Sequence, residues 1–204
     1  MHDGESPTVT RFWLIRHGEP ASEIRGRCYG SLDVGLSETG RRRMQEVAHH
    51  LSGEPLAAIY SSPRRRATES AAILAGPHAC SVTIEPALRE IDFGDFEGRT
   101  YDEIAARYPA LYRQWMETPT TVQFPNGESF ERMRRRVLTA FAALRRGHQG
   151  SAVAVVTHGG VIRILLGSAL RSPRGCLFRM AQRYAALNLL SYLGDHPSVE
   201  LLNG

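Results

Sequence analysis

Two apolar segments near opposite ends of the chain run into the same dipeptide. Residues 12–18 read Phe-Trp-Leu-Ile-Arg-His-Gly, and residues 152–159 read Ala-Val-Ala-Val-Val-Thr-His-Gly. Short runs rich in β-branched and aromatic residues are typical of buried strands. Because the carboxyl ends of parallel strands meet along one edge of a sheet, we expect His17 and His158 to converge there. One such junction alone would more often be an ordinary loop, whereas the pair favours a functional site.

The rest of the chain alternates strand-like and helix-like segments. After a first strand over 10–15, further short apolar runs predict strands at 56–60, 81–84, 152–156, 187–193 and 199–202. Apolar residues at helical spacing predict helices at 37–51, 62–76, 129–146 and 161–170. We expect Ser37, Ser62 and Ser129 to cap the first three helices. The alternation predicts an α/β fold, namely a three-layer α/β/α sandwich with a mainly parallel central sheet.

Residues 95–127 depart from this alternation. Thr100 and Glu103 have the spacing of a capping box that opens a short helix, which Pro109 interrupts. The segment is crowded with aromatic residues, namely Tyr101, Tyr108, Tyr112 and Trp115. A small aromatic core explains them better than stacking on a substrate, although the sequence permits both. We expect a small helical insertion over the site, within a single domain of residues 1–204.

Composition limits the partners and the location. The formal net charge of +4 permits anionic ligands, but the arginines are scattered along helical segments, so we expect no nucleic-acid partner. Three separated cysteines without a Cys-x-x-Cys pair predict no metal site and a reducing compartment. Residues 1–9 lack the pattern of an export signal, and no apolar run reaches membrane-spanning length. These features predict a cytoplasmic protein with no membrane partner.

Five ordered blocks carry a family resemblance. They are Arg-His-Gly-Glu at 16–19, Ser-Ser-Pro-Arg-Arg-Arg-Ala at 61–67, Leu-Arg-Glu-Ile-Asp-Phe-Gly-Asp-Phe-Glu-Gly at 88–98, Phe-Pro-Asn-Gly-Glu-Ser at 124–129 and Thr-His-Gly-Gly at 157–160. Together they resemble the histidine phosphatase superfamily, in its phosphoglycerate mutase-like branch, over nearly the whole chain. Residues 27–34 further resemble the small bacterial alpha-ribazole phosphatase-like members.

The resemblance implies a phosphohistidine mechanism that uses no metal or other cofactor. His17 would be the nucleophile, with a backbone carbonyl holding the proton on its second ring nitrogen. Arg16 and Arg66 would bind the non-bridging phosphate oxygens through planar, permanently charged donors. His158 would donate to the same oxygens, and Gly159 would complete the phosphate pocket.

Glu90 is the candidate proton donor to the leaving alcohol. A carboxyl group acts as an acid near neutrality only if its pKa is raised, which an apolar setting would achieve. The neighbouring Arg89 would oppose this effect unless its side chain points elsewhere. Glu19 and Glu128 are candidates for tethering arginines instead.

The segment expected to meet the substrate departs from the family pattern. Many members carry threonine or serine after Arg-His-Gly-Glu and an asparagine shortly afterwards, where this chain has Pro20 and Glu23. Arg64 stands in place of a usual leucine. Glu23, Arg27 and Tyr29 are the candidate substrate-loop residues. The departures leave the identity of the substrate open.

These observations predict a metal-independent phosphomonoesterase for a small phosphorylated metabolite, such as one resembling alpha-ribazole 5'-phosphate, in a monomer or homodimer. Two alternatives remain open. A phosphoglycerate mutase would return the phosphoryl group to a sugar acid, although the chain and its insertion are short for that branch. A non-catalytic anion- or partner-binding protein on the same fold would have no need of a proton donor such as Glu90.

Overall fold

A six-stranded sheet forms the centre of the computed structural model, which describes residues 8–204. The strands are β1 (Val9–Arg16), β2 (Leu56–Ser61), β3 (Val82–Ile84), β4 (Ala152–Thr157), β5 (Leu187–Leu193) and β6 (His196–Leu201). Their order across the sheet is β3-β2-β4-β1-β5-β6. The first four strands are parallel, and β5 runs antiparallel to both β1 and β6. The predicted N-terminal segment lies largely in residues 1–7, outside the described residues.

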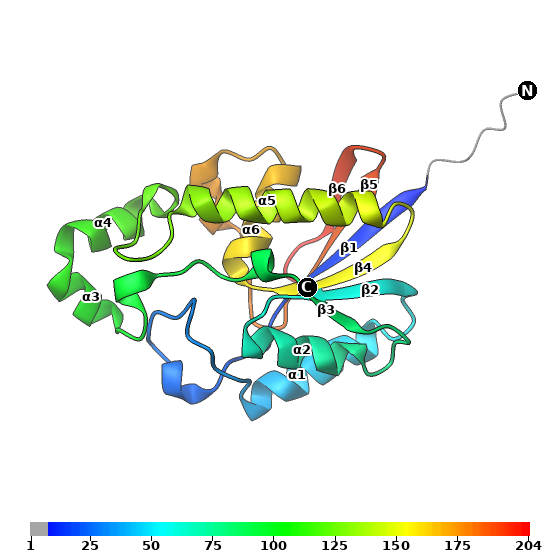
Figure 1. The fold of residues 1–204 in the computed structure, drawn as a ribbon, viewed down its shortest axis with the longest axis horizontal. Helices are drawn as coiled ribbons and strands as arrows, with labels where there is room; N and C mark the ends of the chain where they lie inside the picture. The colour runs from blue at the N-terminus through cyan, green and yellow to red at the C-terminus, as the bar shows by residue number, and fades with distance from the viewer. Residues whose placement is uncertain (1–7) are drawn as a thin grey trace, which may run out of the picture.

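Helices cover both faces of this sheet (Figure 1). They are α1 (Glu38–His50), α2 (Arg65–Ala75), α3 (Tyr101–Arg107), α4 (Pro109–Glu117), α5 (Phe130–Gly147) and α6 (Gly159–Ala169). Short 3-10 turns lie at η1 (Ser22–Ile24), η2 (Pro86–Leu88), η3 (Gly94–Phe96), η4 (Pro119–Thr121) and η5 (Arg174–Arg179). The predicted α/β fold with a mostly parallel sheet is confirmed, and the two strands at the carboxyl end form an antiparallel hairpin.

The side chains of β1 alternate between the two cores. Phe12 and Leu14 pack in the core that α5 and α6 share with one face of the sheet. Trp13 and Ile15 pack on the other face, against α1 and α2. Every residue of β4 is buried. Since successive strand residues point to opposite faces, this alternation fixes the register of the central strands.

The predicted helix caps hold in most places. Ser37 accepts from the Gly40 amide, Ser129 caps α5 and Thr100 forms a complete capping box. The predicted cap at Ser62 is wrong, because α2 begins three residues later, with Arg64 as its N-cap. The Ser62 amide still donates to Val156 of β4 at 3.0 Å, so this residue continues the sheet instead of opening the helix.

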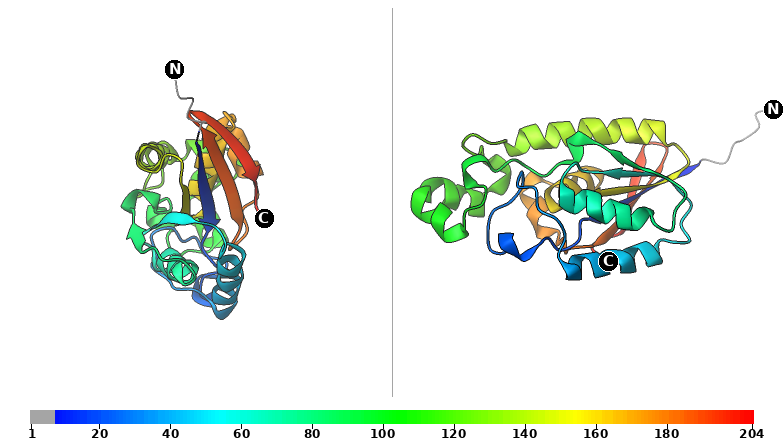
Figure 2. Two further views of the ribbon diagram at one scale, coloured as in Figure 1. Left: turned by 90° about the vertical axis from the view of Figure 1, so that its right-hand side faces the viewer. Right: turned by 60° about the horizontal axis from the view of Figure 1, so that its bottom comes forward.

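The segment predicted to be a helical insertion forms α3 and α4. Figure 1 and the right-hand view of Figure 2 place these helices beyond the end of the sheet toward which β1 runs. That end carries the carboxyl termini of the parallel strands. Trp115 of α4 packs against three phenylalanines and stacks on Tyr101. Its ring centroid lies 5.5 to 5.8 Å from those of Phe93, Phe96, Phe124 and Tyr101. Trp115 therefore packs on a small aromatic core, as predicted, while Tyr101 lies at its exposed edge.

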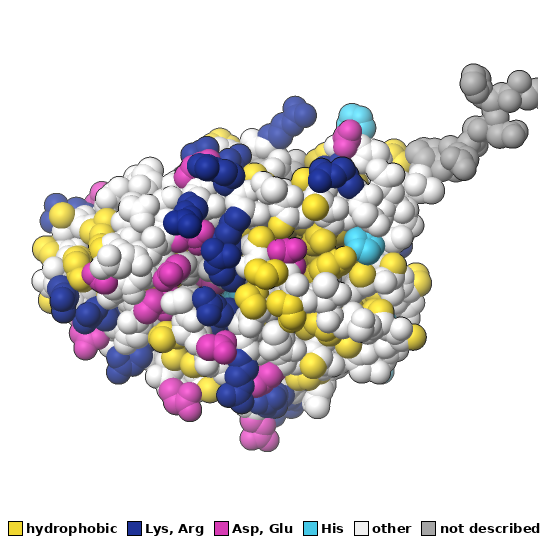
Figure 3. Space-filling model, viewed as in Figure 1, with side chains coloured by type: hydrophobic (Ala, Val, Ile, Leu, Met, Phe, Trp, Pro, Cys, Tyr) yellow, Lys and Arg dark blue, Asp and Glu magenta, His cyan; other side chains and the backbone are white. Residues whose placement is uncertain are grey.

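Charged side chains of both signs share the molecular surface. Figure 3 shows arginine side chains interleaved with acidic ones on the face seen in Figure 1. Within residues 8–204, no helix is long and apolar enough to span a membrane.

One buried ion pair holds the segment that carries Glu90. Arg136 of α5 donates to both carboxylate oxygens of Glu128 at 2.7 and 2.8 Å, which confirms Glu128 as an arginine tether. The same guanidinium donates to the backbone carbonyls of Ala87, Arg89 and Glu90 at 2.7 to 3.1 Å. Arg136 thus fixes the backbone of residues 87–90 to α5.

We expect the Arg136→Met substitution to lower the free energy of unfolding by about 3–5 kcal/mol, because it leaves a buried carboxylate and three carbonyls without a donor. Glu128 is 4% exposed, so water cannot replace the lost donor. Urea denaturation of the variant measures this loss. The exposed Arg135 on the same helix supplies a matched control, Arg135→Met, with an expected change of about 0.5 kcal/mol or less. Equal losses in the two variants would contradict the proposed anchoring.

Candidate active site

Three strand ends bring the site together. Arg16 at the end of β1 is paired with Thr157 of β4, and the His17 amide donates to the Thr157 carbonyl at 2.9 Å. The next residue on each strand is a histidine, and the ring centroids of His17 and His158 lie 5.0 Å apart. The end of β2 lies on the other side of β4, where Ser62 bonds to the Nε2 atom of His158 at 2.7 Å.

The imidazole of His17 is held in one tautomer. Its Nδ1 atom lies 2.8 Å from the Gly18 carbonyl, which can only accept, so the proton of the neutral ring resides on Nδ1. The lone pair of the neutral ring is therefore on Nε2. Gly18 is itself fixed, because its amide donates to the Ser70 hydroxyl at 3.0 Å. A side chain at Gly18 would collide with the Gly40 carbonyl, since a Cβ would lie 2.6 Å from that oxygen.

Both histidines are buried and favour the neutral state. Burial lowers the pKa of His17 well below its usual value, and the positive charges of Arg66 and Arg16 lower it further, against the bond to Gly18. The pKa of His158 is also lowered, first by burial and then by Arg66, His17 and the other nearby arginines. An imidazole that stays neutral below neutral pH keeps its lone pair available for nucleophilic attack.

Two arginines flank His17, and backbone carbonyls fix each of them. Arg66 donates to the carbonyls of Leu32 and Gly30 at 2.7 and 2.8 Å. Arg16 donates to the Gln182 carbonyl at 2.6 Å. Within the described residues the Nε atom of each arginine is buried without a hydrogen-bond partner. Buried guanidinium donors of this kind suit an anionic ligand, because an unpaired buried donor is costly.

A pair of tyrosines connects these arginines, and only one of the two was a predicted site residue. The Arg16 guanidinium lies 4.2 Å from the ring centroid of Tyr184, and that of Arg66 lies 5.1 Å from the centroid of Tyr29. The two phenol oxygens are 2.5 Å apart. Burial, followed by the contact with Tyr184, raises the pKa of Tyr29, so Tyr29 remains un-ionised near neutral pH. Cation–π contacts thus support both guanidinium groups.

The Glu90 side chain lies against the first turn of α6. Its carboxylate accepts from the Gly160 amide at 3.1 Å and from the Ile91 amide at 3.0 Å. A Cβ at residue 160 would lie 2.4 Å from the Glu90 carboxyl group, so a larger residue there would displace that side chain. Arg89 points away from it, donating to the Pro86 carbonyl and lying 3.9 Å from Glu128. The positive charge of Arg89, the neighbour of Glu90 in the sequence, is therefore directed away from the Glu90 carboxyl group.

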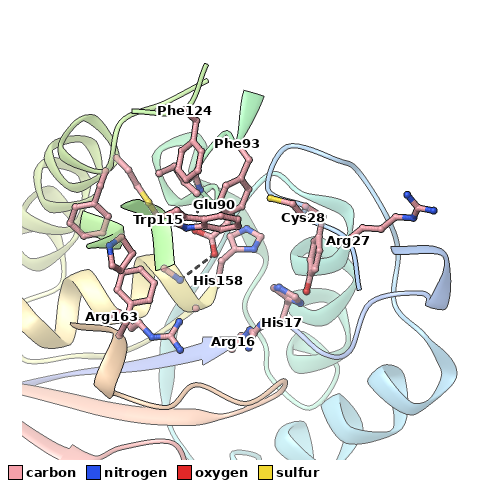
Figure 4. A pocket seen from close by; sticks show the side chains of 18 of the residues that line it. Arg16, His17, Arg27, Cys28, Glu90, Phe93, Trp115, Phe124, His158 and Arg163 are labelled. Atoms are coloured by element: carbon pink, nitrogen blue, oxygen red, sulfur yellow. Dashed lines mark hydrogen bonds between the residues drawn. The ribbon is translucent and has the colours of Figure 1, made fainter. Parts of the chain in front are cut away.

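A cavity of about 240 Å³ joins these groups to an aromatic wall (Figure 4). Its lining includes the predicted residues Arg16, His17, Arg66, Glu90, His158, Gly159, Arg27 and Tyr29. Figure 4 shows Arg16 and His17 on one side, Phe93 and Phe124 on the other, and Glu90 and His158 between them. Of the predicted residues, Glu23 is the exception, since it is exposed on η1 and does not line the cavity. Glu19 bonds to Ser37 and lies 3.9 Å from the exposed Arg25.

Sequence reasoning missed three further residues around the cavity. Arg163 lies one helical turn after Gly159 and donates to the Met180 carbonyl at 2.9 Å. Glu97 accepts from the amides of Gly30, Ser31 and Phe93, among others, and so ties the loop before α1 to the segment before η3. Tyr184 lies in an irregular segment. Two of them had a detectable signal: Arg163 has helical spacing from the His-Gly junction, and Glu97 lies in the family block at 88–98.

Metal ligands do not cluster in the described part of the chain. Across residues 8–204, no group of three or more His, Cys, Asp or Glu side chains is arranged to hold a metal ion. Cys28, Cys80 and Cys176 are free thiols.

Comparison with known proteins identifies the family. Residues 12–204 match the sequence profile of the histidine phosphatase superfamily (branch 1). The chain belongs to this superfamily. This histidine phosphatase is 36% identical over 202 residues to a protein of Mycobacterium tuberculosis named as bifunctional, covering 98% of this chain and 55% of that protein. The chain thus spans about half the length of that relative.

Two further proteins are similar to this chain. Phosphoserine phosphatase 1 of Hydrogenobacter thermophilus is 37% identical over 150 residues, covering 74% of this chain and 71% of the relative. The crystal structure of the alpha-ribazole phosphatase from Shigella flexneri superposes with a TM-score of 0.86 over 95% of this chain and 96% of the other, at 24% identity. The second match shows a shared fold. The family resemblance seen in the sequence is confirmed.

The buried histidines predict a pH-dependent stability. Because the folded-state pKa of each is lowered, the unfolded chain binds protons below about pH 6.5 that the folded chain does not. The free energy of unfolding therefore falls as the pH drops below that value, by about 1.4 kcal/mol per pH unit for each histidine. Denaturant titrations between pH 7 and 5 measure this slope.

The double variant His17→Gln/His158→Gln is the control, because glutamine does not titrate in this range. We expect its unfolding free energy to depend less steeply on pH than that of the wild type, with the acidic residues contributing equally to both. Identical slopes would contradict the lowered pKa of the two histidines.

Proposed function

We propose that this histidine phosphatase is a metal-independent phosphomonoesterase in which His17 carries the phosphoryl group before water accepts it. The observation that carries the proposal is the bond between Nδ1 of His17 and the Gly18 carbonyl. It leaves Nε2 as the nucleophile in a pocket where two fixed arginines provide donors for the phosphate.

In the first step, Nε2 of His17 forms a bond to phosphorus while the bond from phosphorus to the alcohol oxygen breaks. The alcohol oxygen takes a proton from Glu90, which becomes a carboxylate. In the second step, the Glu90 carboxylate takes a proton from water, the water oxygen attacks phosphorus, and the bond from phosphorus to Nε2 breaks. Inorganic phosphate leaves, and both His17 and Glu90 return to their starting states.

Charge stabilisation comes from the groups around the phosphoryl oxygens. Arg16 and Arg66 supply fixed positive charge, and neutral His158 can donate one ring hydrogen. Gly159 begins α6 directly after His158, so the helix amino end adds a partial positive charge. Ser62 holds the His158 ring through its Nε2 atom. Phosphoryl transfer depends mainly on such positioning and electrostatics.

The proposed substrate is a small phosphorylated metabolite, and one resembling alpha-ribazole 5'-phosphate is the specific candidate that the sequence offers. The motif over residues 27–34 supports it, and Arg27 and Tyr29 from this segment line the cavity. The single-domain organisation over 1–204, the oligomeric state and a cytoplasmic location remain predictions from the sequence.

We expect His17→Ala to reduce phosphate release from a panel of phosphomonoesters by about 10³-fold or more, because the nucleophile is removed. The panel includes phosphoserine and 3-phosphoglycerate, and a colorimetric phosphate assay provides the measurement. Release that persists in the variant would contradict the mechanism. Interconversion of phosphoglycerates without net release would indicate a mutase, and anion binding without any turnover would indicate a binding protein.

The role of Glu90 as the proton donor is tested with a glutamine variant. Glu90→Gln keeps the shape of the side chain but cannot donate a proton, so kcat for alkyl phosphates should fall by about 10²–10⁴-fold. The loss should be smaller for aryl phosphates, whose leaving group needs less protonation.

Dialysis against a chelator should leave the wild-type rate unchanged, because the proposed mechanism uses no metal. Recovery of lost activity on adding a divalent metal would overturn the metal-independent mechanism.

A further inference from the structure

The cavity has a second half that phosphoryl transfer does not use. Beyond the phosphate-binding groups it is lined by apolar side chains from several elements, namely Cys28, Phe93, Tyr101, Trp115, Phe124, Phe130, Met133 and Phe178. Trp115 comes from α4 and Phe178 from η5, so the wall is assembled from segments far apart in the sequence. Figure 4 shows Phe93 and Phe124 on the far side of Glu90 from His17, with the Trp115 ring drawn beside Glu90. A leaving group that receives a proton from Glu90 would extend toward this wall.

Two of the aromatic residues that line the cavity are also partly exposed to solvent. Tyr101 is 43% exposed and Phe178 is 45% exposed. The Tyr101 ring is stacked on Trp115, with centroids 5.6 Å apart and planes 16° from parallel. Phe178 lies over the Arg163 guanidinium, 5.5 Å from it. Exposed aromatic surface that adjoins a catalytic pocket is characteristic of a surface that an apolar ligand covers.

The charged groups of the cavity limit what else the ligand can carry. Four arginines line it, namely Arg16, Arg27, Arg66 and Arg163, and Glu90 is the single acidic residue among the described lining residues. That carboxylate is already bonded to the Gly160 and Ile91 amides. An ammonium group on the substrate, as in phosphoserine, would face this positive charge with no acidic partner of its own. An uncharged leaving group avoids that cost.

We propose that the substrate is a monophosphate ester of an alcohol with an uncharged apolar body, aromatic or alkyl, that packs on Tyr101 and Trp115. This inference rests on the proposed function of the same site and names its substrate class. The phosphate is bound by Arg16 and Arg66, and the apolar body supplies the specificity through the surface it buries. Phosphoserine, the substrate named for one relative, falls outside this class.

A homologous series of primary alkyl phosphates tests the inference. Their alcohols have similar pKa values, so differences in kcat/KM report the apolar body and not the leaving-group chemistry. From methyl to butyl phosphate, we expect kcat/KM to rise about threefold for each added methylene. We expect 2-phenylethyl phosphate to exceed phosphoserine by at least tenfold, about 1.4 kcal/mol in transition-state binding. A flat series, or a preference for phosphoserine, would overturn the substrate class.

The matching alkylphosphonates separate this inference from the proposed function, because their carbon–phosphorus bond is not hydrolysed. Calorimetry with the wild type should show the dissociation constant falling along the same series. If phosphate esters are not hydrolysed but phosphonate affinity rises with chain length, the proposed function fails and the apolar subsite stands. If esters are hydrolysed but phosphonate affinity does not change, the subsite fails and the function stands.

Variants of Trp115 link the effect to the aromatic wall. In Trp115→Ala the ratio of the methyl- to butylphosphonate dissociation constants should fall toward one, and Trp115→Phe should restore most of it. Tyr112 lies on the same helix and does not line the cavity, so Tyr112→Leu is the matched control and should keep the wild-type ratio. Thermal unfolding of each variant shows that it is folded. An unchanged ratio in a folded Trp115→Ala variant would overturn the role of the wall.

Discussion

The pairing of β1 with β4 is the constraint on which the rest of the site depends. The two strands are adjacent and parallel, and Arg16 lies opposite Thr157. The following residue on each strand must therefore emerge at the same sheet edge, which places two buried imidazoles side by side. A shift of one residue in either strand would exchange the inward and outward faces of the whole strand. The packing of Phe12 and Trp13 on opposite faces makes that shift costly.

Around the two histidines, hydrogen bonds to backbone groups hold the charged side chains in place. Carbonyls fix Arg16, Arg66 and Arg136, while amides satisfy the carboxylates of Glu90 and Glu97. Backbone partners cannot rotate away, so each charged side chain is held before any ligand binds. Such preorganisation reduces the reorganisation that a reaction would require. The tyrosine pair, Tyr29 and Tyr184, adds an apolar support beneath two of the cations.

The sequence predicted the groups whose positions follow from regular structure. His17 and His158 directly follow continuous apolar strands, and the caps at Ser37 and Ser129 precede amphipathic helices. Prediction was weakest where the backbone is irregular. Ser62 precedes a proline and so fits a helix start, but its amide remains paired with the sheet. The positions of Tyr184 and Glu97 depend on loop conformations that no periodic pattern predicts. Glu23 also lies in such a loop, and it does not line the cavity.

Arg66 has two kinds of partner, and this gives the site a thermodynamic property. Its guanidinium holds the carbonyls of Gly30 and Leu32, in the loop that carries Tyr29, and it also faces the proposed phosphate. Glu97 holds the amides of the same loop from the other side. Anion affinity and loop order are therefore linked through one side chain, and linkage is reciprocal. In the proposed mechanism, an anion that fixes Arg66 also stiffens the loop, and the coupling free energy is the same in both directions.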